Sequence, residues 1–392
     1  MKAGWTQKRL GDFLQVQNGY AFDSKAFGVT GMPLIRIRDL KNGVTTETCF
    51  SGDFDTKYLV NAGDFLIGMD GEFGCYEWKG SVSLLNQRVC RLQGFSTILA
   101  PRFLFYGINS HLKDIEDVTG YTTVKHISSR QILEILMPTP SLAEQNRIVA
   151  ILDEAFDGIA SAKANAEKNL QNARELFVSQ REALLSSQNK WNEAPLTELC
   201  DIKHGYAFEG EYFASKGDHV LLTPGSFFET GGYRERGEKT KYFVGPIPPA
   251  YILGRGDLLV AMTEQAAGLL GSPLLVPESN RFLHNQRLGL VIGKQGVPWI
   301  SEFFFHVFNL LRVRREIHSS ASGVKVRHTS PGKIGTVRVK YPASIEEQRS
   351  VAAELDGLLE HCKRLGDLYK SKIVALDELK RNLLQRAFNG DL

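Results

Sequence analysis

The sequence predicts an α+β protein in which two homologous globular domains alternate with two long helices. The helices are expected to pair as an antiparallel coiled coil, with a pseudo-two-fold axis relating the two halves. Three observations support this: a repeat that occurs twice in the 392 residues, a β-rich and Gly-rich segment in each copy, and a long heptad pattern after each segment. The expected boundaries are globular domains at 1–140 and 188–343, with helices at 141–187 and 344–392.

The repeat is visible as six short motifs that recur in the same order. Gly19-Tyr20-Ala21-Phe22 returns 186 residues later as Gly205-Tyr206-Ala207-Phe208, and Asn86-Gln87-Arg88 returns 199 residues later as Asn285-Gln286-Arg287. The offset between matching motifs grows along the chain to 203 and never falls, which indicates insertions in the second copy. Six collinear matches are not expected by chance, so we infer a duplicated unit of roughly 190–200 residues.

Each globular segment mixes β-rich runs with Gly-rich turns, as at 33–38 and 288–292. Short helices are expected near 103–112 and 301–313. In the run at 33–38, strand alternation would place Arg36 and Arg38 on one face and Ile35 and Ile37 on the other.

Each long helix begins with a capping box, Ser141-x-x-Glu144 and Ser344-x-x-Glu347. Apolar residues then recur in steps of four and three, with one extra step of four at the same place in both copies. An ordinary amphipathic core helix is the alternative, but two matched helices of about 45 residues favour a coiled coil. The expected seam positions are Ile148, Leu152, Ala155, Ile159, Ala162, Ala166, Leu170, Ala173, Leu176, Gln180 and Leu184, and then Val351, Leu355, Leu358, Cys362, Leu365, Tyr369, Ile373, Leu376, Leu379, Leu383 and Ala387.

The composition is that of a soluble globular protein, with 43% hydrophobic and 23% charged residues. No segment is apolar enough for a membrane helix, and the first residues do not resemble a secretory signal. Five scattered cysteines without a C-x-x-C pair indicate reduced thiols in the cytoplasm and no zinc site. A net charge of +3 does not by itself indicate a nucleic-acid partner.

The order globular–helix–globular–helix resembles the specificity subunit of type I restriction–modification enzymes over essentially the whole chain. The likeness includes the Trp5-x4-Leu10 and Trp191-x4-Leu196 openings, the Asn-Gln-Arg triplets and the ending 383–392. The resemblance implies two target recognition domains that each read half of a bipartite, asymmetric double-stranded DNA site. It also implies two methyltransferase subunits docked on the helices, S-adenosylmethionine bound in those subunits and not in this chain, and restriction subunits that join the complex.

Comparing the repeats separates two roles. Residues identical in both copies, such as Gly19 and Gly205 or Asp64 and Asp257, are expected to shape the fold or touch phosphate, whereas divergent loops are expected to read bases. For Arg88 and Arg287, DNA contact and structural pairing are equally supported. For the pairs Lys125-His126 and Arg327-His328, the alternative to DNA contact is a solvated turn. For Arg36 and Arg38, the alternative is a solvated strand face. The expected DNA-binding residues are Arg36, Arg38, Asp70, Glu72, Tyr76, Arg88, Lys125 and His126 in the first domain, and Thr263, Glu264, Gln265, Arg287, Lys325, Arg327 and His328 in the second.

No catalytic motif is found. Pro248-Pro249 lacks the flanking residues of an adenine methyltransferase loop, no phosphate-binding loop is present, and nine histidines show no metal spacing. The sequence therefore predicts a non-catalytic subunit with no catalytic or metal-ligating residues. The alternatives are a coiled-coil scaffold that binds only proteins, or a specificity subunit of another restriction–modification class.

Overall fold

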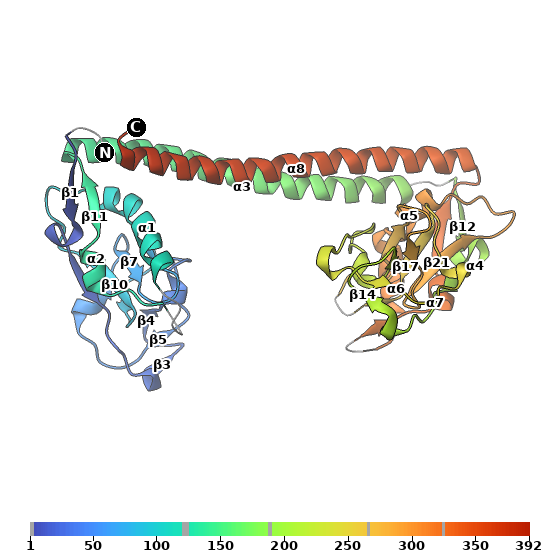
Figure 1. The fold of residues 1–392 in the computed structure, drawn as a ribbon, viewed down its shortest axis with the longest axis horizontal. Helices are drawn as coiled ribbons and strands as arrows, with labels where there is room; N and C mark the ends of the chain where they lie inside the picture. The colour runs from blue at the N-terminus through green and yellow to red at the C-terminus, as the bar shows by residue number, and fades with distance from the viewer. Residues whose placement is uncertain (1–3, 120–124, 187–189, 265–266, 324–325) are drawn as a thin grey trace. The chain divides into compact units, whose positions relative to one another are not determined.

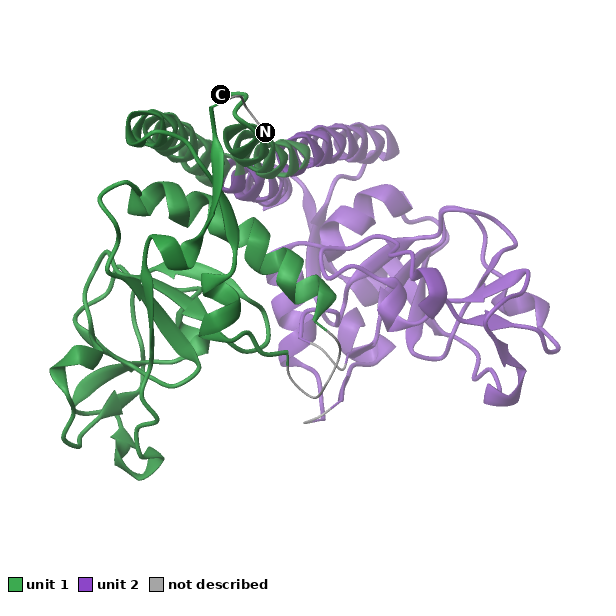
Figure 2. Cartoon of the chain, turned by 60° about the vertical axis from the view of Figure 1, so that its left-hand side comes forward, with its two compact units in different colours: residues 1–166, 371–392 green, residues 167–370 purple. Residues whose placement is uncertain are grey.

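The computed structural model describes residues 4–119, 125–186, 190–264, 267–323 and 326–392. Gln265 and Lys325, both predicted to bind DNA, lie outside these described residues. The chain forms two compact units, one made of Met1–Ala166 with Ser371–Leu392 and the other of Glu167–Lys370 (Figure 2). Each unit combines one globular part with segments of both long helices, so neither unit is a single stretch of sequence.

The globular part of the first unit contains two main sheets and a two-stranded ribbon. In the first sheet the antiparallel strands lie in the order β2 (Gln15–Asn18), β10 (Val89–Gln93), β7 (Phe65–Gly68) and β8 (Gly74–Glu77). The second sheet has the order β3 (Phe27–Gly28), β5 (Cys49–Phe50), β4 (Met32–Ile35), β9 (Ser83–Leu85) and β6 (Leu59–Val60), with β4 and β9 parallel. The ribbon pairs β1 (Thr6–Arg9) with β11 (Leu136–Thr139).

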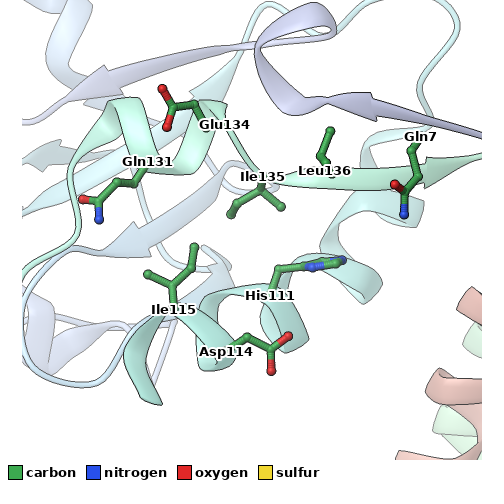
Figure 3. Close-up of a pocket in the computed structure, with 8 residues that line it drawn as sticks. All are labelled: Gln7, His111, Asp114, Ile115, Gln131, Glu134, Ile135 and Leu136. Atoms are coloured by element: carbon green, nitrogen blue, oxygen red, sulfur yellow. The ribbon is translucent and has the colours of Figure 1, made fainter. Parts of the chain in front are cut away.

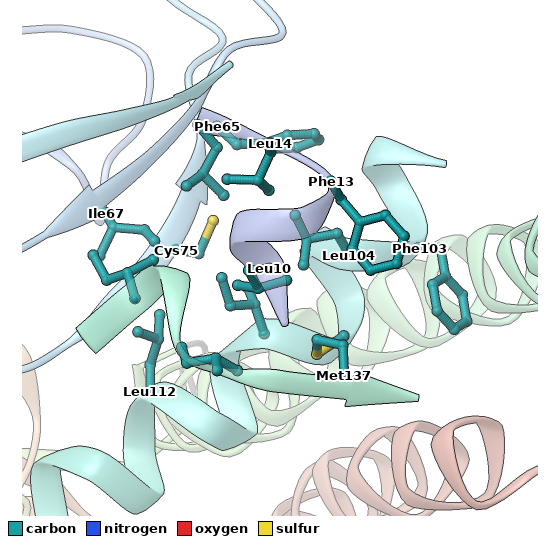
Figure 4. Packing of buried hydrophobic residues seen from close by; sticks show 14 of the residues in the cluster. Leu10, Phe13, Leu14, Phe65, Ile67, Cys75, Phe103, Leu104, Leu112 and Met137 are labelled. Atoms are coloured by element: carbon teal, nitrogen blue, oxygen red, sulfur yellow. The ribbon is translucent and has the colours of Figure 1, made fainter. Parts of the chain in front are cut away.

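Helices α1 (Pro101–Val118) and α2 (Ser129–Leu133) complete this globular part. Helix α1 begins with a proline in its first turn, where no intrahelical N–H bond is lost, and buries apolar residues at helical spacing, among them Phe103, Leu104 and Leu112. These side chains meet strand residues in one hydrophobic core (Figure 4). The core also includes Ile148 and Leu152 from the first long helix and Ala387 from the second, so the helices are part of the domain and not only a linker.

The second unit repeats this plan. Its antiparallel sheet has the order β13 (Cys200–His204), β21 (Leu288–Gly293), β17 (Leu258–Ala261) and β19 (Pro273–Leu275). Its mixed sheet has the order β14 (Phe213–Ala214), β16 (Tyr242–Phe243), β15 (His219–Leu221) and β20 (Phe282–Leu283), with β15 and β20 parallel. Two ribbons pair β12 (Asn192–Pro195) with β23 (Arg338–Tyr341), and β18 (Thr263–Glu264) with β22 (Arg327–His328).

The helices of the second globular part are α4 (Leu196–Leu199), α5 (Ser301–Phe308), α6 (Leu311–Ser319) and α7 (Pro331–Gly335). The single helix expected at 301–313 is in fact two helices, α5 and α6. Leu310 between them is extended, with φ −59° and ψ 135°. The carboxylate of Glu182 then accepts a hydrogen bond from the amide of Leu311 at 2.8 Å and stabilises the new helix start.

The two long helices are α3 (Leu142–Ser186) and α8 (Ile345–Asn389), each of 45 residues, as the heptad pattern predicts (Figure 1). The hydroxyls of Ser141 and Ser344 accept hydrogen bonds from the amides of Glu144 and Glu347, both at 3.3 Å, which confirms the predicted helix starts.

Within each unit the two helices pair antiparallel. In the first unit, Lys380 lies over the ring of Phe156 at 5.0 Å, and Lys163 forms an ion pair with Asp377 at 2.7 Å. Positions therefore rise along α3 as they fall along α8. The α+β fold with an antiparallel helix pair is the predicted one.

The predicted seam is wrong at four positions. Leu176, Leu365 and Leu379 were expected in the seam but are 46%, 41% and 47% exposed, and Gln180 is exposed as well. Phe177 is buried in place of Leu176, and its ring packs edge-on against His306 of α5 at 6.2 Å. In this part of α3 the globular domain, and not only the partner helix, decides which face is buried.

The strand expected at 33–38 is also shorter than predicted. Strand β4 ends at Ile35, and residues Ile37–Asp39 form a 3₁₀ turn. The carboxylate of Asp39 accepts a hydrogen bond from the amide of Arg36 at 2.9 Å and so stabilises this turn. Arg36 and Arg38 therefore do not share a strand face, contrary to the prediction from alternation.

Candidate nucleic-acid interface

The Gly-Tyr and Asn-Gln-Arg motifs meet in both units. Tyr20 bridges Asn86 in parallel pairing, and Tyr206 bridges Asn285 in the same way. The backbones approach so closely that a Cβ at Gly19 would lie 2.0 Å from the carbonyl oxygen of Asn86. At Gly205 the corresponding distance to Asn285 is 2.2 Å. These repeated glycines shape the fold, which is one of the two roles expected for residues identical in both copies.

A second set of backbone contacts gathers the predicted loop residues. The carbonyl of Arg88 accepts a hydrogen bond from the amide of Met69, and the carbonyl of Met69 accepts one from Ile127, both at 2.9 Å. In the second unit Met262 makes the corresponding bonds with Arg287 and Thr329, at 3.0 and 2.9 Å. Three segments far apart in sequence are thereby held together in each unit, and both units use the same backbone frame.

In the first unit this frame brings together Asp70, Arg88 and His126, three of the predicted site residues. One carboxylate oxygen of Asp70 lies 2.6 Å from Nδ1 of His126, and the other lies 3.2 Å from the guanidinium of Arg88. The Asp70 side chain is only 14% exposed, whereas those of Arg88 and His126 are 65% and 57% exposed. A sheltered carboxylate thus holds two exposed basic groups, which is an arrangement suited to an anionic ligand.

The other predicted residues of the first domain surround this cluster less closely. Lys125 donates from its side chain to the carbonyl of Glu116 at 2.5 Å, and its own carbonyl accepts from Gly71 at 2.9 Å. Glu72 is paired with Lys41 at 2.6 Å. Tyr76 is half-buried on β8, where burial raises the pKa of its hydroxyl. Arg38 donates to Thr48 at 3.2 Å, on a different segment from the cluster.

In the second unit the corresponding positions carry different chemistry. Strand β18 pairs Thr263 with His328 and Glu264 with Arg327. The Thr263 hydroxyl lies 3.3 Å from Nδ1 of His328, so a hydroxyl stands where the first unit has the carboxylate of Asp70. Arg287 is exposed, and its amide donates to the side chain of Asn285 at 3.0 Å.

Glu264 was predicted to read bases, but its position assigns it to the support of the loop. Its side chain is 3% exposed, and one oxygen accepts from the amides of Gly268, Leu269 and Leu270 at 3.1, 3.1 and 2.9 Å. The other oxygen lies 3.0 Å from His318. Both oxygens are therefore occupied within the protein.

Two residues outside the predicted DNA-binding set, His318 and Arg314, also support this loop. Arg327 donates to the carbonyl of His318 at 2.6 Å, so His318 lies between Arg327 and Glu264. Arg314 donates to the carbonyl of Gly268, and burial lowers the pKa of its guanidinium to about 10. Neither residue belongs to a motif shared by the two repeats, so comparing the repeats could not reveal them.

A separate pocket lies between α1, α2 and the β1–β11 ribbon (Figure 3). Its volume is about 500 Å³, and it is lined by Gln7, His111, Asp114, Ile115, Gln131, Glu134, Ile135 and Leu136. None of these residues belongs to the predicted DNA-binding set, and burial lowers the pKa of His111. Its mixture of acidic and apolar groups is unsuited to a phosphate backbone.

Among the described residues, no three His, Cys, Asp or Glu side chains are grouped so that they could hold a metal ion. In the same part of the chain, no helix is long and apolar enough to cross a membrane.

Comparison with known proteins agrees with this geometry. Residues 2–171 match the family described as type I restriction modification DNA specificity domain. The EcoBI specificity subunit of Escherichia coli is 37% identical over 166 residues, which cover 42% of this chain but only 35% of that protein. The MjaVIII specificity subunit of Methanocaldococcus jannaschii is 22% identical over 411 residues, which cover 99% of this chain and 93% of that protein.

The fold is also found among solved structures. A chain from a study of complex assembly and conformational transition of the type I R-M system superposes with a TM-score of 0.70 at 17% identity, covering 100% of this chain and 99% of that one. Residues 2–171 thus form a domain of the DNA specificity class, and the second unit repeats its fold. More specifically, the chain is similar along nearly its whole length to a specificity subunit of a type I restriction–modification enzyme, and its residues 2–171 match that family's DNA specificity domain.

Proposed function

We propose that this chain reads a bipartite, asymmetric sequence in double-stranded DNA and directs methyltransferase and restriction subunits to that site. The observation that carries the proposal is the loop frame that both units share. The frame presents Asp70, Arg88 and His126 in one unit but Thr263, Arg287 and His328 in the other. Because the same backbone carries different side chains, each domain reads a different half-site.

In this proposal the long helices hold two methyltransferase subunits. Support comes from large apolar side chains exposed on the helices of each unit. In the first unit Val374 and Leu379 are 57% and 47% exposed, and in the second Leu365 and Leu368 are 41% and 61% exposed. Exposed apolar side chains on a helix are a typical feature of a surface that a partner covers.

We further propose that the chain itself is non-catalytic. The methyl donor, S-adenosylmethionine, would be bound by the methyltransferase subunits, so this chain would need no cofactor. The reaction class is then adenine methylation by the partner at sites that this chain selects, with restriction subunits joining the same complex. The complex is expected to work in the cytoplasm, where its DNA lies.

Single-molecule sequencing of methylated adenines tests this function. Cells would express the methyltransferase partner with and without the chain. A split, asymmetric methylated motif that depends on the chain is the expected result. A contiguous or palindromic motif would instead indicate another restriction–modification class.

The scaffold alternative makes the opposite prediction. If the chain only binds proteins, it forms a stable complex with the methyltransferase subunits but gives no new motif. A complex that methylates a known control sequence, yet gains no motif from this chain, would contradict the proposed function.

A further inference from the structure

We infer that Asp70 is a positioning residue that fixes Arg88 and His126 as one DNA-contacting unit for the first half-site. The inference rests on the proposed function and assigns a role that the sequence alone did not separate. Asp70 was predicted to read bases directly. Its surroundings indicate that it acts on DNA only through its two basic neighbours.

The first argument is accessibility. Asp70 is 14% exposed at its side chain, and its two oxygens face His126 at 2.6 Å and Arg88 at 3.2 Å. A carboxylate that is largely covered, and whose two oxygens both face basic partners in the protein, is poorly placed to accept from a cytosine amino group. Arg88 and His126, at 65% and 57% exposure, keep most of their surface available to a ligand.

The second argument is the backbone at Arg88. Its φ is 69°, in the left-handed region that non-glycine residues rarely adopt. Arg88 and Asn280 are the only non-glycine residues with positive φ in the described part of the chain. The hydrogen bond from Met69 to the Arg88 carbonyl at 2.9 Å helps to hold this conformation. Strained backbone of this kind concentrates at functional positions, where it aims a side chain.

The third argument is the contrast between the two units. Thr263 occupies the place of Asp70 in the same backbone frame and contacts His328 through its hydroxyl at 3.3 Å. No carboxylate oxygen is available at this position to pair with Arg287. The described structure also gives Arg287 no left-handed backbone. The fixed pair of basic groups is therefore a property of the first domain, and with it of one half-site.

This arrangement has an electrostatic consequence. The carboxylate offsets one positive charge and so weakens attraction to any phosphate backbone, while it fixes where the remaining donors point. Removing only its charge should strengthen binding to random DNA and weaken discrimination at the first half-site. A residue that merely stabilised the fold would not change these two properties in opposite directions.

The test uses the full chain in complex with its methyltransferase subunits. Asp70→Asn keeps the size and shape of the side chain but removes the charge and replaces one acceptor oxygen with an NH2 donor. Asp53→Asn is the matched control, because Asp53 is an exposed aspartate of the same domain outside the cluster. The methylated motif is read by single-molecule sequencing, and affinity for a random-sequence duplex is measured as a function of salt.

For Asp70→Asn we expect base preference in the first half of the motif to fall roughly tenfold, with the second half unchanged. The slope of log affinity against log salt on the random duplex should steepen by about one. Asp53→Asn should leave the motif unchanged. A wild-type motif that persists in Asp70→Asn with an unchanged salt slope would overturn the role of Asp70.

Two outcomes keep the proposals separate. If the wild-type chain gives no split motif, the proposed function fails, and this inference fails with it. If Asp70→Asn proves unstable, His126→Gln at an exposed position tests the same pair of contacts. That variant should also weaken only the first half-site, and an unchanged motif would contradict the inference.

Discussion

The side-chain oxygen of Gln145 accepts a hydrogen bond from the amide of Ala100 at 2.8 Å, and the side-chain nitrogen of the same residue donates to the carbonyls of Ile98 and Pro140, both at 3.0 Å. Gln145 is 0% exposed and lies in the first turn of α3. It therefore joins the start of the long helix to the segment before α1. Gln348 makes the same three bonds at the start of α8, so the duplicated chain kept this connection twice.

Replacing Gln145 with Leu should destabilise the first unit by about 3 kcal/mol, because it leaves one buried donor and two buried acceptors without partners. The loss is measured as a lower melting temperature in calorimetry and faster hydrogen exchange around 98–101. Gln171→Leu is the control, because Gln171 is an exposed glutamine of the same helix. Its side chain donates a hydrogen bond to the carboxylate of Glu175 at 2.6 Å, on the surface of the helix. Equal effects of the two changes would contradict the role given to Gln145.

Gly19→Ala should cost about 3 kcal/mol, because the added Cβ would lie 2.0 Å from a backbone carbonyl that cannot move aside easily. Gly158→Ala serves as the control. No atom lies within 4 Å of the Cβ position at Gly158, which sits inside α3, so alanine there should stabilise the helix by about 1 kcal/mol. Opposite shifts in melting temperature are expected, and a tolerated Gly19→Ala would show that the close approach is unimportant.

The stability of the second unit should fall in mild acid because of His284. Burial lowers the pKa of His284 to about 4 from the ordinary 6.5, and its Nε2 donates to the carbonyl of Leu288 at 2.9 Å. In the unfolded chain His284 is therefore protonated below about pH 6.5, whereas in the folded chain it stays neutral down to about pH 4. Stability is full above pH 6.5 and declines by about 3 kcal/mol as the pH falls to 4.

The first repeat suggests the variant that tests this effect. The position equivalent to His284 is Leu85, which is buried at 0% exposure. His284→Leu should remove this part of the pH dependence in urea unfolding curves recorded from pH 7 to 4. If the variant keeps the wild-type slope, His284 is not the group responsible.

Docking of a methyltransferase subunit should depend on exposed apolar residues of α8. Leu368→Glu, at 61% exposure, places a charge on that surface without disturbing the core, and should weaken co-purification with the methyltransferase more than tenfold. Val29→Glu is the control, because Val29 is 88% exposed but lies in the globular part of the first unit. Retention of the methyltransferase by Leu368→Glu would exclude this surface.

The sequence predicted the duplicated architecture because repetition and heptad spacing are properties of order along the chain. The Ser141 and Ser344 helix starts follow from local hydrogen bonding and are also present. The seam failed at Leu176 because a tertiary contact, Phe177 against His306, selected a different face of the helix. The strand through Arg36 failed because Asp39 offered its amide a local partner, which residue alternation does not detect.

The candidate site was only partly accessible to the same reasoning. Motif comparison selected Asp70, Arg88 and His126, which the structure brings together, although their contact with DNA stays a prediction. It could not distinguish a residue that holds others from one that reads bases, because both are polar and both lie in divergent loops. Burial decides that distinction for Glu264, and burial depends on contacts with His318 and the loop at 268–270.

The composition of the first unit has a consequence for synthesis of the chain. Its core contains Ala387, and Phe388 packs against Phe103 with ring centroids 4.8 Å apart. These residues leave the ribosome only after the whole second unit has been made. The hydrophobic core of the domain translated first therefore stays incomplete, with apolar side chains exposed, until the final turns of α8 emerge. A ribosome stalled shortly before residue 371 would hold a nascent chain whose first domain is open to chaperones and proteases.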